Sequence, residues 1–181
     1  MLEEEYQATH RPREAQRNLP PLEVPFEYSL RDARLEDMPD VREIYNHYVA
    51  NSTVTFDETP LSLRETRSKF QHLKKLGMPY LVAESPSQQI LGYAYVYPWK
   101  EKAAYRYTVE NSIYLRAAST GKGLGKVLMG ELITRSKQAG LKEIIAVIAD
   151  KGAEASIKMH QDFGFKFERW LGTVLMQKSL K

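Results

Sequence analysis

The sequence predicts a single α+β domain in which a mixed sheet carries helices on both faces. Three observations support this prediction. The chain has 181 residues, enough for one domain with a sizeable hydrophobic core. Segments with apolar residues at helical spacing are interspersed with runs in which apolar and polar residues alternate, as in strands. Their order is one strand, two helices, three strands, one helix, one strand, one helix and a final β region.

The start of the chain differs in composition from the rest. Residues 1–26 are charged, contain Pro12, Pro20, Pro21 and Pro25 and lack sustained periodicity, so we expect a tail or arm there. Residues 27–181 contain all the expected elements and form the expected domain. The expected strands lie at 27–34, 80–84, 90–99, 105–117 and 143–150, with two short β segments within 164–180. The expected helices lie at 35–51, 62–76, 124–139 and 154–163.

Capping residues and periodic apolar residues support the individual helices. Asp37 lies near the start of the first helix, and Gly77 with Pro79 ends the second. The first helix has one apolar and aromatic side, made of Val41, Ile44, Tyr45, Tyr48 and Val49. The third helix has an apolar stripe of Leu124, Val127, Leu128 and Leu132, and it stops at Gly140. Tyrosines at a spacing of two are interpreted mainly as strand packing: Tyr93, Tyr95, Tyr97, Tyr105 and Tyr107.

Composition excludes several classes of function. The chain has no cysteine, which excludes disulfides, thiolate metal sites and cysteine nucleophiles. Its four histidines are not spaced as metal ligands on one helix, so no metal is expected. A net charge of +3 is too small to predict a nucleic-acid partner. No apolar run approaches the length of a membrane span and the start is acidic, so we expect no membrane partner and a cytoplasmic location.

Three glycines at every second position open the third helix, directly after a strand and a short polar loop. Gly121, Gly123 and Gly125 let backbone N–H groups point outward without an obstructing Cβ atom. The helix N-terminus adds partial positive charge, and Lys122 and Lys126 add full charges. These residues predict a phosphate or pyrophosphate site, although they also fit a glycine-rich turn on a solvated basic face.

Two common phosphate ligands do not fit this turn. A nucleotide-hydrolysing P-loop ends in Gly-Lys-Ser/Thr, whose hydroxyl holds magnesium, whereas this turn ends in Gly125-Lys126-Val127. A dinucleotide-binding turn has the spacing GxGxxG early in a βαβ unit, whereas this spacing is GxGxG in the second half of the chain. A loop that holds a pyrophosphate without metal or ribose recognition suits coenzyme A.

Longer motifs carry a family resemblance. The order of elements, the glycine turn and SIKMHQDFGF after a buried strand resemble the GNAT superfamily of acetyl-CoA-dependent N-acetyltransferases. The segments IYNHYV, TVTFDETPLS, GYAYVYPWKEKAAYRYTVENSIYL and GKGLGKVLM resemble its phosphinothricin/methionine sulfoximine acetyltransferase subgroup, over about residues 27–181. The resemblance implies the GNAT fold, with a mostly antiparallel central sheet flanked by helices. It also implies acetyl-CoA as the acetyl donor, no metal, a small amine substrate and a homodimer.

The resemblance assigns catalytic roles to two residues. Glu110 matches the family's catalytic glutamate in its T-x-E motif. Strand alternation alone places Glu110 on one face with Ser112 and Tyr114, where it is either a partly desolvated base or a solvated strand residue. His160 stands where many superfamily members have a tyrosine that protonates the leaving thiolate. A histidine near a helix C-terminus can also be structural.

The resemblance also implies binding residues. The strand residues Ile113, Tyr114 and Leu115 are expected beside the pantetheine arm, where their backbone pairs with it like a neighbouring strand. The pyrophosphate is expected at Gly121, Lys122, Gly123, Leu124, Gly125 and Lys126. Positions that line the acceptor pocket are matched by Phe56, Lys100, Lys102, Tyr105 and Tyr114, where lysines suit a carboxylate and aromatic rings suit the walls.

Three positions depart from the pattern of the resembled family. Thr120 replaces the usual Gln or Arg, which removes one side chain but no backbone N–H donor. Ala153 replaces the subgroup's usual asparagine. Relatives carry about ten more residues between the positions of Phe165 and Lys166, so a strand or hairpin is expected to be missing here. Either the acceptor site is shorter and more open, or a mobile hairpin is absent from this sequence.

The expected activity is transfer of an acetyl group from acetyl-CoA to the primary amine of a small amino-acid-like acceptor. Glu110, directly or through a water, takes the proton of the amine, and His160 or Tyr114 protonates the thiolate. Backbone N–H groups near Leu115 are expected to stabilise the oxyanion. Two alternatives stay open at this point: a protein or peptide N-acetyltransferase, and a non-catalytic module that binds coenzyme A.

Overall fold

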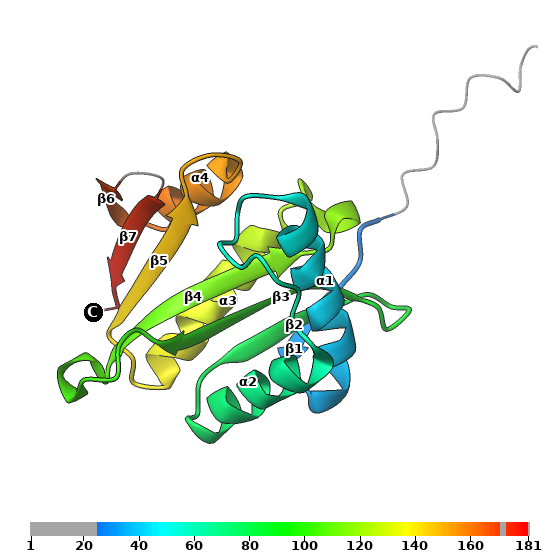
Figure 1. Ribbon diagram of the computed structural model, residues 1–181, viewed down its shortest axis with the longest axis horizontal. Helices are drawn as coiled ribbons and strands as arrows, with labels where there is room; N and C mark the ends of the chain where they lie inside the picture. Colours follow the sequence, from blue (N-terminus) through cyan, green and yellow to red (C-terminus); the bar gives the residue numbers. More distant parts are fainter. Residues whose placement is uncertain (1–24, 171–172, 181) are drawn as a thin grey trace, which may run out of the picture.

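The computed structural model describes residues 25–170 and 173–180, and the side chains of 25–165 and 176–180. Seven strands form one sheet in the order β1-β2-β3-β4-β5-β7-β6. Every pair of neighbouring strands is antiparallel except β4 and β5, which are parallel. Helices α1 and α2 cover one face of the sheet and α3 covers the other (Figure 1). The predicted mostly antiparallel sheet with flanking helices is therefore confirmed.

The elements follow one another in nearly the predicted order and positions. The strands are β1 (Ser29–Asp32), β2 (Tyr80–Glu84), β3 (Ile90–Pro98), β4 (Thr108–Leu115), β5 (Glu143–Ala149), β6 (Lys166–Trp170) and β7 (Thr173–Ser179). The helices are α1 (Met38–Asn51), α2 (Leu63–Lys75), α3 (Leu124–Gln138) and α4 (Glu154–Asp162). Three short 3₁₀ turns accompany them: η1 (Leu35–Asp37), η2 (Ala103–Tyr105) and η3 (Ala117–Ser119).

Local signals account for the ends of α2, the helix that later contributes to the site. The side-chain oxygen of Ser62 accepts a hydrogen bond from the Glu65 backbone N–H at 3.2 Å. The Glu65 carboxylate in turn accepts from the Ser62 N–H at 2.8 Å, which completes a reciprocal cap. Gly77 has a φ of +69°, a backbone conformation that favours glycine and stops the helix.

The strand predicted at 105–117 is shorter than expected. Trp99 donates its backbone N–H to the Thr108 carbonyl at 3.1 Å, so β4 begins at Thr108, after the predicted start at residue 105. The intervening chain turns through η2, so Tyr105 and Tyr107 lie outside the sheet and are 40% and 41% exposed. The interpretation of these two tyrosines as strand packing was wrong. Tyr93 and Tyr95, in contrast, are buried in β3 as expected.

Helix α3 buries a different set of side chains from the predicted stripe. Leu124, Leu128 and Leu132 are fully buried, as expected. Val127 is 43% exposed, whereas Met129 is fully buried. The buried arc therefore extends from the leucines toward Met129, and Val127 lies beyond its opposite edge, because successive helical residues are offset by about 100°.

The two faces of the sheet carry separate hydrophobic clusters. In β2, Leu81 and Ala83 pack with α3, whereas Tyr80 and Val82 pack with α1 and α2. This alternation is the two-residue period of a strand buried on both sides. The faces are therefore chemically distinct, since the α1/α2 face is rich in tyrosine and the α3 face is aliphatic.

The sheet opens between β4 and β5. Their parallel pairing covers only Thr108 to Glu110 in β4, opposite Glu143 to Ile145 in β5. Beyond this point the two strands diverge, while β5 pairs with β7 on its other side along its whole length (Figure 1). Residues 111–115 of β4 therefore have one strand edge that faces the opening.

Candidate functional site

Glu110 lies where the sheet branches. It is the last residue of β4 that pairs with β5, and on its other side it lies opposite Tyr97 of β3. The side chain is half-buried on the α1/α2 face. Burial raises the pKa of this carboxyl, and the positive charge of Lys69 opposes part of the increase. A carboxylate in this position is a stronger base than a solvated one.

A wall of tyrosines surrounds the same face of β3 and β4. The rings of Tyr93 and Tyr114 stack with centroids 5.7 Å apart, and those of Tyr93 and Tyr95 with centroids 6.2 Å apart. Tyr45 from α1 meets Tyr114 edge to face at 5.1 Å. Tyr114, expected to line the acceptor pocket, is therefore part of an aromatic surface continuous with Glu110, since strand alternation places both on one face.

Lys69 on α2 is a member of this site that the sequence analysis did not identify. Its Nζ donates a hydrogen bond to the Tyr95 hydroxyl oxygen at 2.6 Å. The same nitrogen lies 4.7 Å from the centre of the Tyr95 ring and 5.9 Å from that of Tyr97. The helical spacing could have indicated this position. Lys69 follows the buried Thr66 by three residues and precedes the buried Leu73 by four, so it lies next to the buried side of α2.

The loop between α1 and α2 borders the aromatic wall. Tyr45 donates its hydroxyl to the Asp57 carboxylate and also pairs with Thr55 at 2.9 Å. Burial, assisted by Asp57, raises the pKa of Tyr45 to about 12. Phe56 lies between these two loop residues and is 64% exposed. Phe56 is thus at the rim of the face and not within its core.

The glycine turn has the backbone conformation that the sequence analysis required. Gly121 and Gly123 have φ values of +73° and +81°, and a Cβ atom on either would meet no atom within 4 Å. Gly123 caps α3. Within the described part of the chain, the backbone N–H groups of residues 121–125 meet no acceptor. Together with the N-terminus of α3, they form a concave donor surface suited to an anion.

The turn and the opening in the sheet are neighbours. A Cβ atom on Gly125 would lie 3.7 Å from Leu115 at the end of β4 and 3.4 Å from Met159 of α4. Lys126 forms an ion pair with Asp162 of α4 at 2.7 Å. Lys122 instead places its Nζ 4.6 Å over the ring of Phe26.

The open edge of β4 leads from Glu110 to this turn. Ile113, Tyr114 and Leu115 pair with β3 on one side only, so their other edge faces the opening. The Leu115 carbonyl accepts a hydrogen bond from the Tyr48 hydroxyl at 2.7 Å. An extended ligand can pair with this edge in the manner of a strand.

His160 lies on the opposite face of β4 from Glu110. It is 2% exposed, and its Nε2 is 3.0 Å from the Nδ2 of Asn111, the residue after Glu110. Its Nδ1 is 2.7 Å from the Ser156 carbonyl. A carbonyl only accepts, so Nδ1 carries the proton and Nε2 accepts from Asn111. Burial lowers the pKa of His160 to about 4, and the ring is neutral at neutral pH.

The predicted acceptor residues of the β3–β4 hairpin lie apart from Glu110. Lys102 precedes η2 and Tyr105 ends it, at the tip of the hairpin that projects from the sheet (Figure 1). Lys100 places its Nζ 5.4 Å over the Trp99 ring. Both lysines are exposed. The structure thus brings together Glu110 and Tyr114, and it places these hairpin residues at the margin of the face.

The three sequence departures have plain structural counterparts. Thr120 donates its hydroxyl to the Ala117 carbonyl at 2.8 Å, which closes its own turn. Ala153 is buried at the start of α4. The region after Phe165 forms the two expected β segments, β6 and β7, which pair directly with each other. The side chains of Arg169 and Trp170 in β6 lie outside the described residues.

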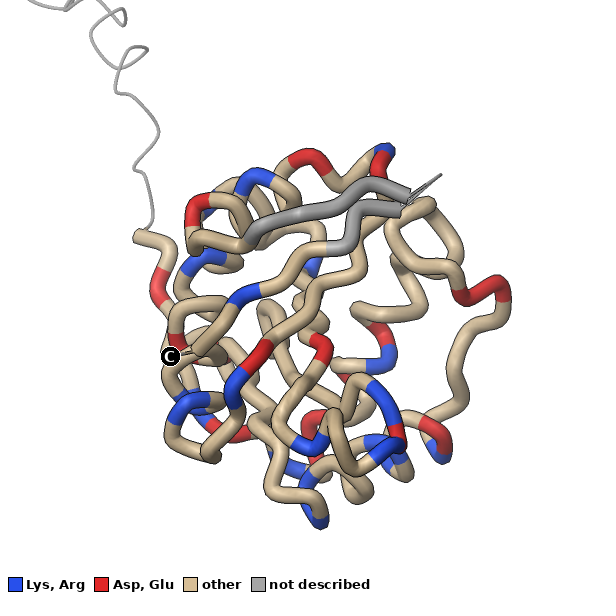
Figure 2. Tube along the Cα trace, turned by 90° about the vertical axis from the view of Figure 1, so that its left-hand side faces the viewer, with Lys and Arg blue, Asp and Glu red and all other residues tan. Residues whose placement is uncertain are grey.

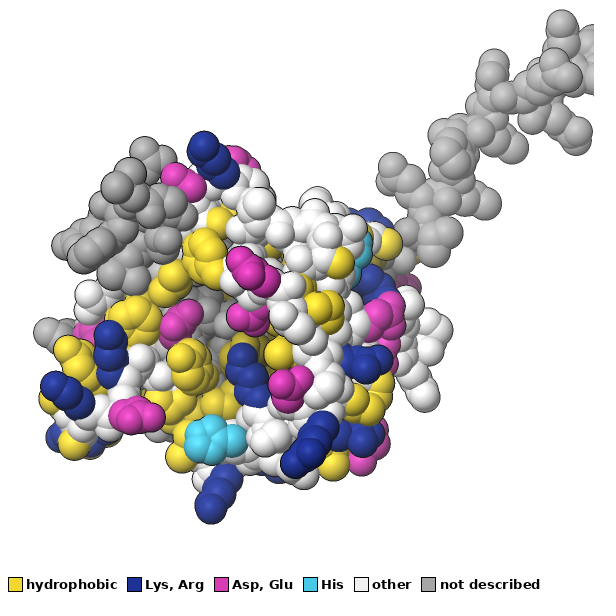
Figure 3. Space-filling model, viewed as in Figure 1, with side chains coloured by type: hydrophobic (Ala, Val, Ile, Leu, Met, Phe, Trp, Pro, Cys, Tyr) yellow, Lys and Arg dark blue, Asp and Glu magenta, His cyan; other side chains and the backbone are white. Residues whose placement is uncertain are grey.

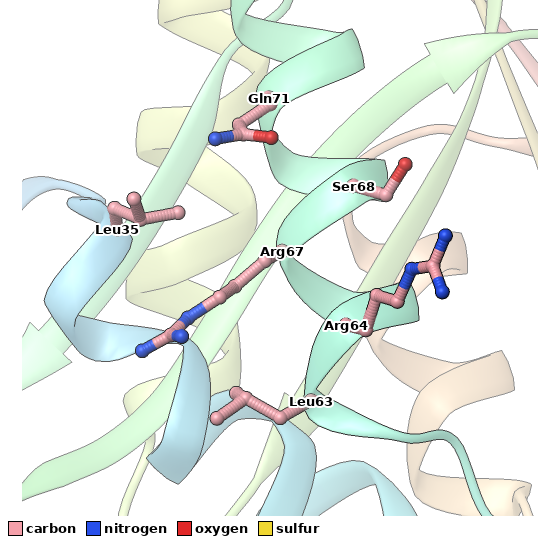
Figure 4. A pocket seen from close by; sticks show the side chains of 6 residues that line it. All are labelled: Leu35, Leu63, Arg64, Arg67, Ser68 and Gln71. Carbon is pink, nitrogen blue, oxygen red and sulfur yellow. The ribbon is translucent and has the colours of Figure 1, made fainter.

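A surface groove of about 620 Å³ lies between η1 and α2. Its lining residues are Leu35, Leu63, Arg64, Arg67, Ser68 and Gln71. Arg67 reaches from α2 toward η1, whereas Arg64 and Ser68 leave α2 on the other side (Figure 4). The groove contains neither Glu110 nor the glycine turn, so it is separate from the site described above.

The face of the molecule over α2 and β4 is hollowed. Figure 3 shows hydrophobic, acidic and basic side chains gathered around this hollow. Charges of both signs are interspersed along the chain on the side shown in Figure 2. Among the described residues, no three His, Cys, Asp or Glu side chains are grouped as metal ligands. None of the helices in the described ranges has the length and apolar character needed to cross a membrane.

Comparisons with known proteins agree with this geometry. Residues 30–175 match the model of the acetyltransferase (GNAT) domain family. The chain is 36% identical to a phosphinothricin N-acetyltransferase of Alcaligenes faecalis, over 84% of this chain and 82% of the relative. It is 38% identical to an L-methionine sulfoximine/L-methionine sulfone acetyltransferase of Pseudomonas paraeruginosa, over 84% of this chain and 94% of the relative.

The fold matches a solved structure with its acetyl donor bound. That structure is a GNAT superfamily phosphinothricin acetyltransferase from Sinorhizobium meliloti in complex with AcCoA. It is 37% identical, with a TM-score of 0.79, over 84% of this chain and 88% of that chain. The chain therefore belongs to the GNAT acetyltransferase family and is an acetyl-CoA-dependent N-acetyltransferase.

Proposed function

We propose that this enzyme acetylates the α-amine of a small amino acid or amino-acid analogue of the phosphinothricin and methionine sulfoximine type. The names of its relatives support this acceptor class. The observation that carries the proposal is the position of Glu110, a half-buried carboxylate at the branch of the sheet beside a tyrosine-lined face.

The residues of the opening fit acetyl-CoA. The backbone N–H groups of residues 121–125 suit its pyrophosphate, and Lys122 and Lys126 flank them, with Lys126 paired to Asp162. The free edge of β4 at Ile113, Tyr114 and Leu115 suits the amide groups of its pantetheine arm. Bound there, acetyl-CoA supplies an acetyl group activated as a thioester.

Glu110 is the proposed general base. An amino-acid amine is mostly protonated at neutral pH and must lose a proton before it can attack. Because burial raises the pKa of Glu110, its carboxylate accepts this proton more readily than a solvated glutamate would. The positive charge of Lys69 limits this increase in the pKa, which suits a base that must be ionised at neutral pH.

The proton balance of the reaction requires no second titrating residue. For each amide formed from a protonated amine the acceptor nitrogen loses two protons: the thiolate gains one, and the other is released to solvent. Glu110, once protonated, is a stronger acid than Tyr114, whose pKa burial raises far above its usual value. His160 holds its single proton in the bond to Ser156. We therefore propose that Glu110 carries the proton and that His160, predicted as the acid, fixes Asn111 beside it.

The rim residues have a secondary role in this proposal. Phe56 borders the hollow from the loop before α2, and Lys100, Lys102 and Tyr105 border it from the β3–β4 hairpin. Their exposure suits residues that meet an acceptor as it enters. Because these side chains are exposed, a charge-assisted hydrogen bond from them to the acceptor is weaker than it would be in a buried site.

The proposal also covers the domain organisation, the oligomeric state and the cellular location of the protein. Residues 27–181 act as one catalytic domain, the enzyme is a homodimer, and it works in the cytoplasm, where acetyl-CoA is supplied. The exposed aromatic side chains Tyr105 and Tyr107 support a contact between subunits near the hairpin. Sedimentation at micromolar concentration tests the dimer: a single species with the mass of one chain would contradict it.

A thiol-release assay tests the acceptor class. The enzyme is incubated with acetyl-CoA and a panel that contains phosphinothricin, methionine sulfoximine, methionine sulfone, a polyamine and a lysine peptide. We expect thiol release with the amino-acid analogues and none above background with the polyamine or peptide. Release with the peptide alone would favour protein acetylation, and tight acetyl-CoA binding without release for any amine would favour a non-catalytic module.

A further inference from the structure

The tyrosine-lined face contains one basic side chain whose position relative to Glu110 has a clear chemical use. We infer that Lys69 binds the carboxylate of the amino-acid acceptor and so determines that the substrate is an α-amino acid. This inference rests on the proposed function and names a specificity residue within the same site.

The position of Lys69 is defined by contacts with two tyrosines. Its Nζ donates to the Tyr95 hydroxyl oxygen at 2.6 Å and lies 4.7 Å from the centre of the Tyr95 ring. It lies 5.9 Å from the centre of the Tyr97 ring. Tyr95 is 5% exposed and stacks against Tyr80 at 4.8 Å, so the hydroxyl that holds the ammonium group belongs to a rigid wall.

Lys69 and Glu110 are both neighbours of one tyrosine, Tyr97. Tyr97 is the register partner of Glu110 across β3 and β4, and Lys69 approaches the same ring from α2. The two charges influence each other, since Lys69 lowers the pKa of Glu110 against the effect of burial. Within the described part of the chain, Lys69 forms no ion pair, so its ammonium group is available to an anion.

This pair of charges complements an α-amino acid. The acceptor amine must approach Glu110 to lose its proton, and in an α-amino acid the carboxylate is attached to the next carbon atom. An ammonium group close to Glu110 therefore attracts that carboxylate, while it repels the second amine of a diamine or polyamine. The Asp57 carboxylate, bound by Tyr45, adds a negative charge on the loop side of the face and further favours a zwitterion with its amine on that side.

The lysines predicted from the sequence are less suited to this role. Lys100 and Lys102 are exposed on the hairpin, and Lys100 lies over the Trp99 ring at 5.4 Å. Lys69 is exposed as well, so exposure does not distinguish the three lysines; the difference lies in their contacts with the tyrosine-lined face. Lys69 is held against Tyr95 by a hydrogen bond, and its position is fixed before the acceptor arrives.

The test compares an amino acid with its own carboxamide as acceptors, using methionine sulfone and methionine sulfone amide with acetyl-CoA. The measured quantity is the ratio of kcat/KM for the acid to kcat/KM for the amide. We expect this ratio to be well above 1 for the wild-type enzyme and to fall at least tenfold in Lys69→Met. Lys69→Arg keeps the positive charge and should retain most of the ratio.

Two variants serve as controls. Lys74 is on the same helix and also lies over an aromatic ring, that of Phe70 at 5.8 Å, so Lys74→Met tests the loss of a helix lysine away from Glu110. It should leave the ratio at the wild-type value. Lys100→Met tests whether Lys100, in place of Lys69, binds the carboxylate of the acceptor. A circular dichroism spectrum establishes that each variant is folded.

The outcomes separate the inference from the proposed function. A wild-type ratio in Lys69→Met, or a tenfold fall in Lys100→Met without one in Lys69→Met, would overturn the role of Lys69 and leave amino-acid acetylation in place. A wild-type enzyme that acetylates neither the acid nor the amide would contradict the proposed function itself. Equal use of acid and amide by the wild type would overturn the inference alone.

Discussion

Glu110 combines two opposing influences on one side chain. Burial disfavours its charged form, and the positive charge of Lys69 favours it, with burial the larger effect. The sequence predicted Glu110 from its T-x-E motif and its strand face. It did not predict Lys69, because this charge interaction joins a helix and a strand that are far apart in the sequence, which periodicity does not relate. Local sequence patterns identify the face of a helix or strand on which a residue lies. Which charged residues become neighbours depends on how the helices pack on the sheet.

The raised pKa of Glu110 predicts an effect on stability. A carboxyl whose pKa is higher in the folded protein than in the unfolded chain stabilises the fold below the unfolded value, and this contribution is lost as the pH rises through the folded value. At neutral pH the ionised Glu110 therefore destabilises the fold. We expect Glu110→Gln to raise the melting temperature at pH 7, and we expect the difference to shrink toward pH 4. Calorimetry across this range checks it, and a lower melting temperature at pH 7 would contradict it.

His160 predicts the opposite dependence on pH. Burial lowers its pKa from 6.5 to about 4 in the folded protein. The unfolded chain therefore binds a proton between these values that the folded protein does not, and stability falls as the pH decreases from about 6.5 toward 4. Denaturant unfolding of the wild type and of His160→Gln measures this. In the variant, the free energy of unfolding should depend less steeply on pH in this range. An unchanged dependence on pH would show that His160 is not buried in the neutral form.

At the scale of elements, most helices and strands were predictable because their signals are local. Ser62 and Gly77 mark the ends of α2 through a short-range backbone hydrogen bond and a positive φ, whereas Asp37 precedes α1 without a capping bond to it. The segment at 105–107 was misassigned because alternating tyrosines resemble a strand wherever they occur. Only the cross-strand bond from Trp99 to Thr108 determines where the hairpin closes, and that bond is a tertiary contact.

The glycine turn predicts a matched pair of variants. Gly123 and Gly140 have φ values of +81° and +78°, and a Cβ atom on either meets nothing within 4 Å. A valine at either position therefore incurs a similar backbone strain, roughly 1–2 kcal/mol. Gly123 caps α3 at the proposed pyrophosphate site, whereas Gly140 follows the other end of α3.

Thermal shift by acetyl-CoA distinguishes these variants. The wild type and Gly140→Val should both gain melting temperature when acetyl-CoA is added, because ligand binding stabilises the folded state. Gly123→Val should gain little, since its side chain obstructs the approach of the phosphates. An equal shift in both variants would place the pyrophosphate away from the glycine turn.

At the scale of the whole molecule, the opening of the sheet organises the site. The donor is assigned to the free edge of β4 and the glycine turn, and the acceptor to the tyrosine-lined face under α1 and α2. Glu110 lies where the two meet, at the last β4–β5 pair. The fold class followed from the order of elements and the family resemblance. The point at which β4 and β5 part did not, because it depends on the register between two strands that are separated in the chain by helix α3.

The central claim is that Glu110 deprotonates the acceptor amine in transfer from acetyl-CoA. The most direct measurement compares kcat of the wild type and Glu110→Gln for one amino-acid acceptor at saturating acetyl-CoA, with the N-acetyl product identified by mass spectrometry. At pH 7 we expect Glu110→Gln to be slower by ~10²–10⁴-fold. The gap should narrow at about pH 9–10, where the amine loses its proton unaided. Turnover of Glu110→Gln at the wild-type rate at pH 7 would contradict the claim.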